Sequence, residues 1–391
     1  MDFSFSSDQE QFRKAVADFA AGRLAPGAGV RAKSDVFPWD LVREMATLGL
    51  LCVMTPEEFG GQAISEHVVL GIVVEELAKA DFNLASIPIV TNLVSNLIDA
   101  FASDRVKAEL LPKVAAGDML VALGLTEPET GSDAAALKAR ATRTSNGYVL
   151  RGEKTSITAL PSASAVVVFA STDPAARAKG VSAFVVPLDL PGISVQRFDD
   201  TGYRCIGRGA LTLDDVEIPH DALLGQEGQA FTNIMNGFDY TRPLLALTAI
   251  ASARVALQET AEYAGVRTSF GRPLANYQGV AFKLAEHWTE LELARLLCYR
   301  TLWLRDQNSP HTVEAAMCKW FAPERAFRAV HDCLLVHGHV GYSTESPFEQ
   351  RLRDVLAMEI ADGTAQIQKL VIARGVFGRE FGTLSSSEPT C

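Results

Sequence analysis

A run of short, β-branched segments in the middle of the chain constrains the fold more than any other feature. These segments lie between Met119 and Leu224 and include "MLVALGL", "SAVVVFAS" and "VSAFVVPL". Gly, Pro, Asn and Asp separate them, which is typical of strands joined by turns, and Asn146-Gly147 predicts a two-residue hairpin turn. Because no helix-length pattern interrupts the strands, we expect an antiparallel barrel or sandwich.

Segments of helical period lie on both sides of this β segment. Near the N-terminus, Phe12, Val16 and Phe19 have i, i+4, i+7 spacing, and Ser7 is a candidate N-cap. The stretch "HVVLGIVVEELAKA" is apolar almost all round, which indicates a buried helix.

Three long amphipathic patterns follow the β segment. They begin near Arg242, Tyr277 and His311, with charges on one face and apolar residues on the other. The sequence therefore predicts an α+β fold with an N-terminal helical domain, a middle antiparallel β-barrel or sandwich domain and a C-terminal helical bundle. We place their boundaries at 1–118, 119–225 and 226–391.

Composition excludes several classes of function. The 391 residues are 48% hydrophobic and carry a net charge of −11, which argues against binding nucleic acid through clustered Lys and Arg. No apolar run is long enough to span a bilayer, and "MDFSFSSDQE" resembles neither a secretory signal nor an Arg-rich transit peptide. The six cysteines have no paired spacing, so we expect reduced thiols in a cytoplasmic protein.

Common nucleotide, hydrolase and metalloprotease motifs are absent from the sequence. There is no G-x-G-x-x-G after a strand, no Walker loop, no G-x-S-x-G and no H-E-x-x-H. His331, Cys333, His337 and His339 are close in sequence, but His337 and His339 would point apart on a helix and no second ligand group matches them. We therefore expect no metal site.

The stretch "LTEPETGSDAAALKA" follows a predicted strand and has two possible interpretations. Thr126, Gly131 and Ser132 would form a turn with hydroxyls and free N–H groups, which suits an anion or a polar ring edge. The alternative is an ordinary strand-to-helix loop in which Ser132 is the N-cap. Spacing alone favours the ordinary loop.

Six stretches in order resemble the acyl-CoA dehydrogenase family of flavoproteins. They are "PEEFGG" at 56–61, "GLTEPETGSD" at 124–133, "GEKTSIT" at 152–158, "DYTRP" at 239–243, "FGRPLANYQGVAFKLAE" at 270–286 and "GHVGYSTESPFEQRLRDVLAMEIADGTAQIQKLVIAR" at 338–374. The resemblance covers nearly the whole chain. It implies the three-part fold described above, with a four-helix bundle as the C-terminal domain. It also implies non-covalent FAD between the β-domain and the C-terminal helices, and an acyl-CoA thioester against the flavin.

The resemblance also implies roles for individual residues in cofactor binding. Thr126 would bond the flavin ring edge, Ser132 would lie at the FAD diphosphate and the pantetheine of the substrate, and Thr158 would approach flavin N5. The remaining implied cofactor contacts are Ser156 near the flavin, Arg267, Ser269 and Gln278 toward the FAD of a neighbouring subunit, Leu335, His337 and Gly338 at a Gly-rich turn, and Thr364 and Gln366 at the adenosine. Sharing of the cofactor between subunits implies a homo-oligomer, usually a tetramer.

The catalytic base is the residue on which the resemblance is most informative. The family places a Glu in a Tyr-Glu-Gly-Thr motif, and here the same stretch is Ala361-Asp362-Gly363-Thr364. Asp362 would therefore take the Cα proton, with a carboxylate set back by about 1.5 Å and a pKa raised from about 3.9 by burial. Its N–H would polarise the thioester carbonyl, while Ala361, Gly363, Asp239 and Arg242 would contact the substrate.

Two alternatives to this assignment of the base follow from the sequence. Asp362 could cap a helix that begins near Thr364, and the two roles are compatible. Some family members place the base just before the Arg of the "DYTRP" stretch, but that position is Thr241 here and cannot serve as a base.

Departures from the family pattern bear on the substrate. Ser156 and Ala159 replace an aromatic residue and an Asn near the flavin, Leu335 replaces a Gln, and Ala361 replaces the Tyr beside the base. Smaller side chains and a shorter base suit an acyl group that is bulky at Cα and Cβ. An aspartate base also resembles that of alicyclic acyl-CoA dehydrogenases, so the sequence favours a ring-bearing or branched substrate such as cyclohexane-1-carboxyl-CoA.

Three other functions remain open at this point. Nitroalkane oxidases share the fold and use an Asp base without CoA, and an acyl group on a carrier protein could replace acyl-CoA. A third possibility is a DNA-binding flavoprotein relative, against which the −11 charge argues. For a dehydrogenase, the resemblance implies an electron-transfer flavoprotein as the electron acceptor.

Overall fold

The computed structural model describes residues 4–378 and Phe381. The N-terminal part is helical, as predicted, and its helices are α1 (Ser7–Phe19), α2 (Ala28–Arg31), α3 (Trp39–Thr47), α4 (His67–Ala80), α5 (Ser86–Phe101) and α6 (Asp104–Ala115). The N-cap of α1 is Ser6, one residue before the expected Ser7, because the Ser6 hydroxyl accepts from the backbone of Gln9 and the Gln9 side chain accepts from the backbone of Ser6.

The middle of the chain forms one eight-stranded sheet. Its strands are β1 (Val121–Gly124), β2 (Arg140–Arg143), β3 (Gly147–Thr158), β4 (Ala165–Ser171), β5 (Val181–Pro187), β6 (Ile193–Arg197), β7 (Arg208–Pro219) and β8 (Leu223–Leu224). The spatial order is β6-β7-β3-β2-β4-β5-β8, with β1 beside β4. Most neighbours are antiparallel, as expected, but β1–β4 and β2–β4 are parallel. The chain reverses twice between β2 and β4, so β4 returns to the direction of β2.

The predicted hairpin joins β2 and β3, but its turn differs from the expected two residues. Residues 144–146 connect the strands, because Gly147 is already part of β3 and its carbonyl accepts from the N–H of Thr144 at 2.9 Å. The predicted hairpin is therefore confirmed, but its turn ends at Asn146, one residue earlier than expected.

Long helices make up the C-terminal part. They are α7 (Ala230–Val266), α8 (Gln278–Asp306), α9 (Thr312–His337), α10 (His339–Tyr342), α11 (Pro347–Ile360) and α12 (Ala365–Phe377), with a small hairpin of β9 (Thr268–Ser269) and β10 (Arg272–Pro273) between α7 and α8. Helix α7 begins at Ala230, well before the Arg242 suggested by the pattern. Pro243 lies inside it and removes one backbone donor, but the buried helix continues through it.

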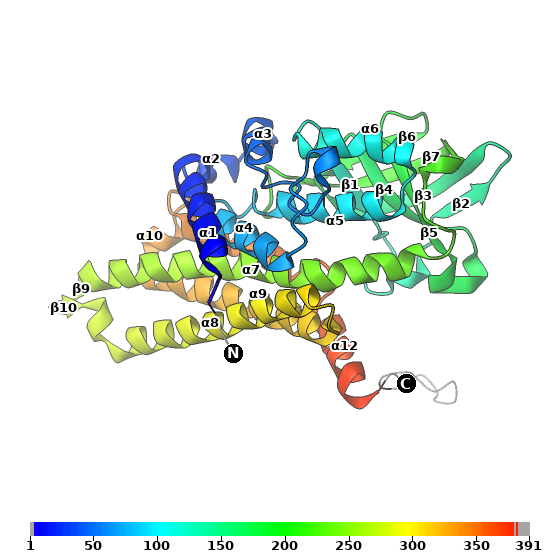
Figure 1. Ribbon diagram of the computed structural model, residues 1–391. Helices are drawn as coiled ribbons and strands as arrows, with labels where there is room; N and C mark the ends of the chain where they lie inside the picture. The colour runs from blue at the N-terminus through cyan, green and yellow to red at the C-terminus, as the bar shows by residue number, and fades with distance from the viewer. Residues whose placement is uncertain (1–3, 379–380, 382–391) are drawn as a thin grey trace.

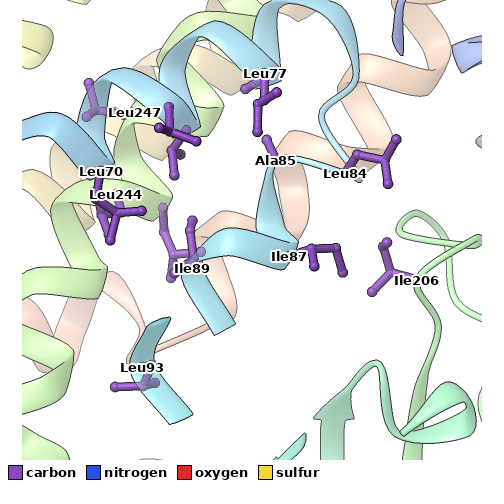
Figure 2. Close-up of a cluster of buried hydrophobic side chains, with 14 of the residues drawn as sticks. Leu70, Leu77, Leu84, Ala85, Ile87, Ile89, Leu93, Ile206, Leu244 and Leu247 are labelled. Carbon is purple, nitrogen blue, oxygen red and sulfur yellow. The ribbon is translucent and has the colours of Figure 1, made fainter. Parts of the chain in front are cut away.

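Two hydrophobic cores hold these parts together. The larger core joins the N-terminal helices to α7 and α9 and also reaches one face of the sheet, while the smaller core lies inside the sheet domain. Figure 2 shows Leu70 of α4 beside Leu244 of α7, and Leu77 of α4 beside Ala85, with Leu93 of α5 below them. Helix α4 is buried on nearly all sides, as its sequence predicts.

Figure 1 shows where the sheet and the β9–β10 hairpin lie relative to α7. The sheet lies at the end of the molecule where α7 begins, and the β9–β10 hairpin lies at the opposite end, beyond the end of α7. Among the described residues, no helix has the length and apolar character needed to cross a membrane. The five described cysteines are free and buried, and Cys391 lies outside the described residues.

Candidate active site

The loop between α11 and α12 carries Asp362 in an unusual backbone conformation. Asp362 has φ +51° and Gly363 has φ +98°, so two consecutive residues are left-handed. Aspartate tolerates this region better than most residues. At position 363 a Cβ atom would lie 2.4 Å from Nε2 of Gln368, so only glycine fits without displacing that side chain.

Side chains from three helices donate hydrogen bonds to the backbone carbonyls in and beside this loop. The buried amide of Gln368 on α12 donates to the carbonyls of Asp362 at 3.0 Å and Gly363 at 3.2 Å. Lys319 on α9 donates to the carbonyl of Met358 at 2.5 Å and to that of Gly363 at 3.4 Å, and Arg242 on α7 donates to the carbonyl of Asp362 at 3.4 Å. The backbone around Asp362 is therefore fixed by hydrogen bonds to its carbonyls.

The carboxylate of Asp362 points toward α7 and accepts a hydrogen bond at Oδ2 from the hydroxyl of Thr241, at 3.0 Å. The N-cap of α12 is Thr364. The cap interpretation of Asp362 is therefore wrong for its side chain, because that side chain is engaged with another helix. The N–H of Asp362 makes no hydrogen bond within the part of the chain that the structure describes.

Burial and nearby cations act on Asp362 in opposite directions. Burial is the largest influence and raises the pKa of the Asp362 carboxyl, while Lys319, Arg242 and the Thr241 hydroxyl partly offset it. Burial also lowers the pKa of Lys319 to about 8. A carboxylate with a raised pKa in a partly closed site is a common property of catalytic bases.

Asp239 and Arg242 lie one turn apart on α7 and are both buried. The guanidinium of Arg242 donates to Oδ1 of Asp239 at 3.0 Å, and Thr312 at the start of α9 donates to Oδ2 at 2.5 Å. Asp239 therefore holds the guanidinium of Arg242, which in turn donates to the carbonyl of Asp362 in the loop between α11 and α12. Contact of either residue with the CoA part of a substrate stays a prediction.

The sheet domain presents the first group of predicted cofactor residues. Thr126 is half-buried at the end of β1, where its carbonyl accepts from the N–H of Thr155 at 2.8 Å. Ser132 and Ser156 are exposed, and Ser156 has φ +58° at an irregularity in the pairing of β3 with β7. Ser132 does not cap a helix, since Asp133 is the N-cap of the following 3₁₀ turn.

A buried ion pair fixes the loop that follows Thr126. Nζ of Lys154 lies 2.7 Å from Oε1 of Glu127, and both side chains are almost completely buried. The same carboxylate accepts from the backbone N–H groups of Lys138 and Ala139. One glutamate, Glu127, therefore connects the beginning of the loop between β1 and β2 to its end.

The far end of the molecule presents the second group. Arg267, Ser269 and Gln278 lie around the β9–β10 hairpin. Ser269 and Gln278 line a hollow of about 580 Å³ together with Arg272 and Tyr277. This hollow is open, and its lining mixes polar with apolar residues such as Phe270 and Leu274.

The end of α9 lies close to the end of α7. His337 stacks on Tyr263 of α7 with ring centres 4.1 Å apart and on Phe348 of α11 at 4.2 Å. Leu335 is exposed on α9, and Gly338 follows the helix with φ +61°. The ring of His337 is therefore part of the packing, and burial lowers its pKa.

Comparison with known proteins decides the family. Models of the acyl-CoA dehydrogenase N-terminal, middle and C-terminal domains match residues 6–118, 122–216 and 228–377. The chain is 38% identical over 358 residues to the human mitochondrial short-chain specific acyl-CoA dehydrogenase, which covers 91% of this chain and 87% of that protein. The chain belongs to the acyl-CoA dehydrogenase family.

Two further relatives of this family resemble the chain over almost its whole length. The probable acyl-CoA dehydrogenase YngJ of Bacillus subtilis (strain 168) is 36% identical over 377 residues, 96% of this chain and 99% of that protein. The solved structure of butyryl-CoA dehydrogenase from Megasphaera elsdenii superposes with a TM-score of 0.91 at 32% identity, over 96% of this chain and 100% of that one. As a family member, the protein is an FAD-dependent oxidoreductase.

The residues that the resemblance assigns to FAD lie in different parts of this acyl-CoA dehydrogenase. The exposed hydroxyls of Ser132 and Ser156 lie in the sheet domain, whereas the hollow beside Ser269 and Gln278 lies at the opposite end of α7 (Figure 1). Thr364 and Gln366 lie at the start of α12, apart from both.

Sequence reasoning missed two residues of the site. Thr241 was considered only as an alternative base and set aside, yet its hydroxyl contacts Asp362. Lys319 received no role, although a lysine within the apolar run "AAMCKWFA" was a usable signal. Its side chain is 1% exposed and reaches the loop from α9.

Proposed function

We propose that this protein catalyses the FAD-dependent α,β-dehydrogenation of an acyl-CoA thioester, with Asp362 as the base that takes the Cα proton. The observation that carries this proposal is the carboxylate of Asp362, which is oriented by Thr241 and displayed by a loop whose carbonyls are tied to three helices. FAD, when bound, supplies the acceptor for the hydride that leaves Cβ.

The protein's own groups have separate roles in the proposed reaction. Asp362 removes the proton through its carboxylate and donates its free N–H to the thioester carbonyl, which acquires negative charge as the proton leaves. Lys319 and Gln368 hold the carbonyls of the loop, so the N–H and the carboxylate keep their positions during the reaction.

Cofactor binding in this proposal needs more than one chain. Thr126, Ser132, Ser156 and Thr158 would hold the flavin and diphosphate from the sheet domain. A second subunit would add Arg267, Ser269 and Gln278, which the length of α7 separates from the sheet domain. We therefore propose a homo-oligomer, a tetramer by the family resemblance, that works in the cytoplasm and passes electrons to an electron-transfer flavoprotein.

The proposed substrate is a ring-bearing or branched acyl-CoA, such as cyclohexane-1-carboxyl-CoA. Ala361 and Ser156 leave more space than the Tyr and the aromatic residue that the family pattern places there. The carboxylate of Asp362 is one methylene shorter than that of a glutamate, which leaves room for an α-carbon carrying a larger group. Short, linear thioesters are the competing class, because relatives of this chain carry the names short-chain specific acyl-CoA dehydrogenase and butyryl-CoA dehydrogenase.

The test of the base is a pair of substitutions at Asp362. Asp362→Ala and Asp362→Asn keep FAD and lower kcat by about 10²- to 10⁴-fold, the usual contribution of a general base. Asp40→Asn is the matched control, since the Asp40 side chain is fully exposed and should leave kcat unchanged. An Asp362→Asn enzyme with kcat within a few-fold of wild type would remove Asp362 from the reaction.

The pH dependence of kcat tests the same assignment. Asp362 acts only when ionised, so kcat falls as the pH drops through its raised pKa, and this acid limb lies above that of an ordinary aspartate. The residual activity of Asp362→Asn should lack the limb. A wild-type profile that is flat down to pH values near the pKa of a free aspartate, about 3.9, contradicts the proposal.

Anaerobic bleaching of the flavin by a panel of thioesters tests the substrate. Cyclohexane-1-carboxyl-CoA and a branched acyl-CoA should reduce the flavin faster than butyryl-CoA, and the opposite order rejects the substrate proposal alone. Reduction by nitroalkanes without CoA would instead indicate a nitroalkane oxidase, and preference for a carrier-protein thioester would indicate a carrier-linked enzyme. Filter binding at low salt tests the DNA-binding alternative.

A further inference from the structure

The hydroxyl of Thr241 is directed differently from those of four other threonines inside the long helices. Thr248 and Thr260 of α7 donate back to carbonyls of their own helix, at 2.7 Å each, and Thr289 and Thr301 of α8 do the same at 2.9 and 2.8 Å. This is the ordinary behaviour of a threonine within a helix. Thr241 instead donates across to another segment, so its hydroxyl has a partner outside its helix.

That partner is Oδ2 of Asp362, at 3.0 Å, and Thr241 is only 1% exposed. A buried hydroxyl has one hydrogen to give, and an ionised carboxylate can only accept. The interaction is thus a hydrogen bond to a charged group, which is stronger than one between neutral groups. It also restricts the rotation of a side chain whose backbone is already held by Gln368 and Arg242.

We propose that Thr241 is the positioning residue of the Asp362 base: its hydroxyl holds the short carboxylate in one orientation and gives up this bond when the carboxylate takes a proton. The inference rests on the proposed function of Asp362. Once Asp362 carries the proton, its O–H becomes the donor and the oxygen of Thr241 becomes the acceptor. The hydroxyl hydrogen of Thr241 then turns to the carbonyl of Gly237, four residues earlier, as Thr260 already does with Ala256.

Other titratable groups near Asp362 also influence its protonation. Lys319 of α9 and Arg242 of α7 favour the carboxylate form of Asp362. Burial is the main influence that raises the pKa of Tyr203, in the loop after β6, and the charges of Asp354 and Asp362 raise it further. Replacing Thr241 leaves the formal charges of Lys319, Arg242 and Asp362 in place. A change seen on its substitution therefore reports the hydrogen bond.

The experiment compares Thr241→Val with Thr241→Ser in the FAD-loaded enzyme. Valine keeps the branched shape and loses the hydroxyl, so we expect kcat to fall about 10-fold and the acid limb to move up by about one pH unit, as for loss of a hydrogen bond to a charged group. Serine restores the donor and should return both values close to wild type. Melting temperature and FAD content serve to show that both variants are folded.

A direct measurement of Asp362 separates this effect from activity. The infrared carbonyl stretch of its protonated carboxyl, assigned by its loss in Asp362→Asn, should appear at higher pH in Thr241→Val than in wild type. In the Asp362→Asn background, adding Thr241→Val should change kcat less than twofold, because the charged acceptor is already gone.

The outcomes distinguish the two proposals. If Asp362→Asn is inactive while Thr241→Val retains the wild-type kcat, acid limb and infrared titration, the role of Thr241 is overturned and the base remains. If Asp362→Asn stays active, the proposed function itself fails. A 10-fold loss in Thr241→Val that serine does not restore also overturns the inference, since the hydroxyl would then not be the cause.

Discussion

Replacing Gly363 with alanine tests whether the loop needs the left-handed backbone that places Asp362. Gly363 has φ +98°, and an added Cβ would lie 2.4 Å from Nε2 of Gln368. A left-handed alanine costs about 1 to 2 kcal/mol. The Gln368 side chain is buried and must move away, which weakens its bonds to the carbonyls of Asp362 and Gly363.

The expected loss of stability follows from these two terms. The displaced Gln368 amide loses both of its acceptors, and leaving a buried donor unpaired costs about 1 to 3 kcal/mol. Together with the left-handed alanine, the total is about 2 to 5 kcal/mol. A shift of the loop by even about 1 Å displaces the Asp362 carboxylate and lowers kcat by up to about 100-fold. The substitution should thus lower both stability and kcat, while Asp362 and all charges are unchanged.

The assay combines thermal unfolding of the FAD-loaded protein with steady-state kinetics. Gly29→Ala is the matched control, because Gly29 lies in α2, no atom lies within 4 Å of its added Cβ and its φ is not positive. That control should be neutral or slightly stabilising. A Gly363→Ala enzyme with the melting temperature and kcat of the control would refute the view that the turn geometry fixes the base.

Two buried lysines give the remaining predictions. Lys319→Met keeps the apolar stem but loses the donor to the carbonyl of Met358, so kcat should fall. The acid limb of kcat should move to higher pH, because the positive charge that favours ionised Asp362 is gone. A pH–rate profile that does not move contradicts this prediction. Lys154→Met leaves Glu127 buried without its partner, which should cost about 3 to 5 kcal/mol and loosen FAD binding. Burial raises the pKa of Glu127 and Lys154 lowers it, with a net lowering, while burial lowers the pKa of Lys154 to about 8. Stabilisation by the charged pair is therefore present above the unfolded glutamate pKa of about 4.3 and below about pH 8, and it is lost as the pH falls or rises beyond this window; melting curves across pH should lose that dependence in the variant.

Local pattern was sufficient for most of the elements and for singling out Asp362 as the proposed base. The β-branched segments predicted the sheet, the helical period predicted α8 and α9 closely, and the Ala361–Thr364 stretch marked Asp362 through its resemblance to a family motif. These features depend on neighbours within a few residues, which a sequence displays directly. Whether neighbouring strands are parallel or antiparallel was harder to predict, because the pattern of apolar residues indicates which side chains are buried and not the direction in which a strand runs.

The surroundings of Asp362 were decided only by the tertiary structure. Thr241 lies 121 positions before Asp362 and reaches it from another helix. Lys319 comes from a third helix, and no period or spacing in the sequence links it to the loop. The sequence by itself determined which carboxylate is displayed, because that depends on a local motif. The packing of α7, α9 and α12 around the loop decided how the carboxylate is held and how its pKa is shifted, because burial and hydrogen bonds between distant segments exist only in the folded chain.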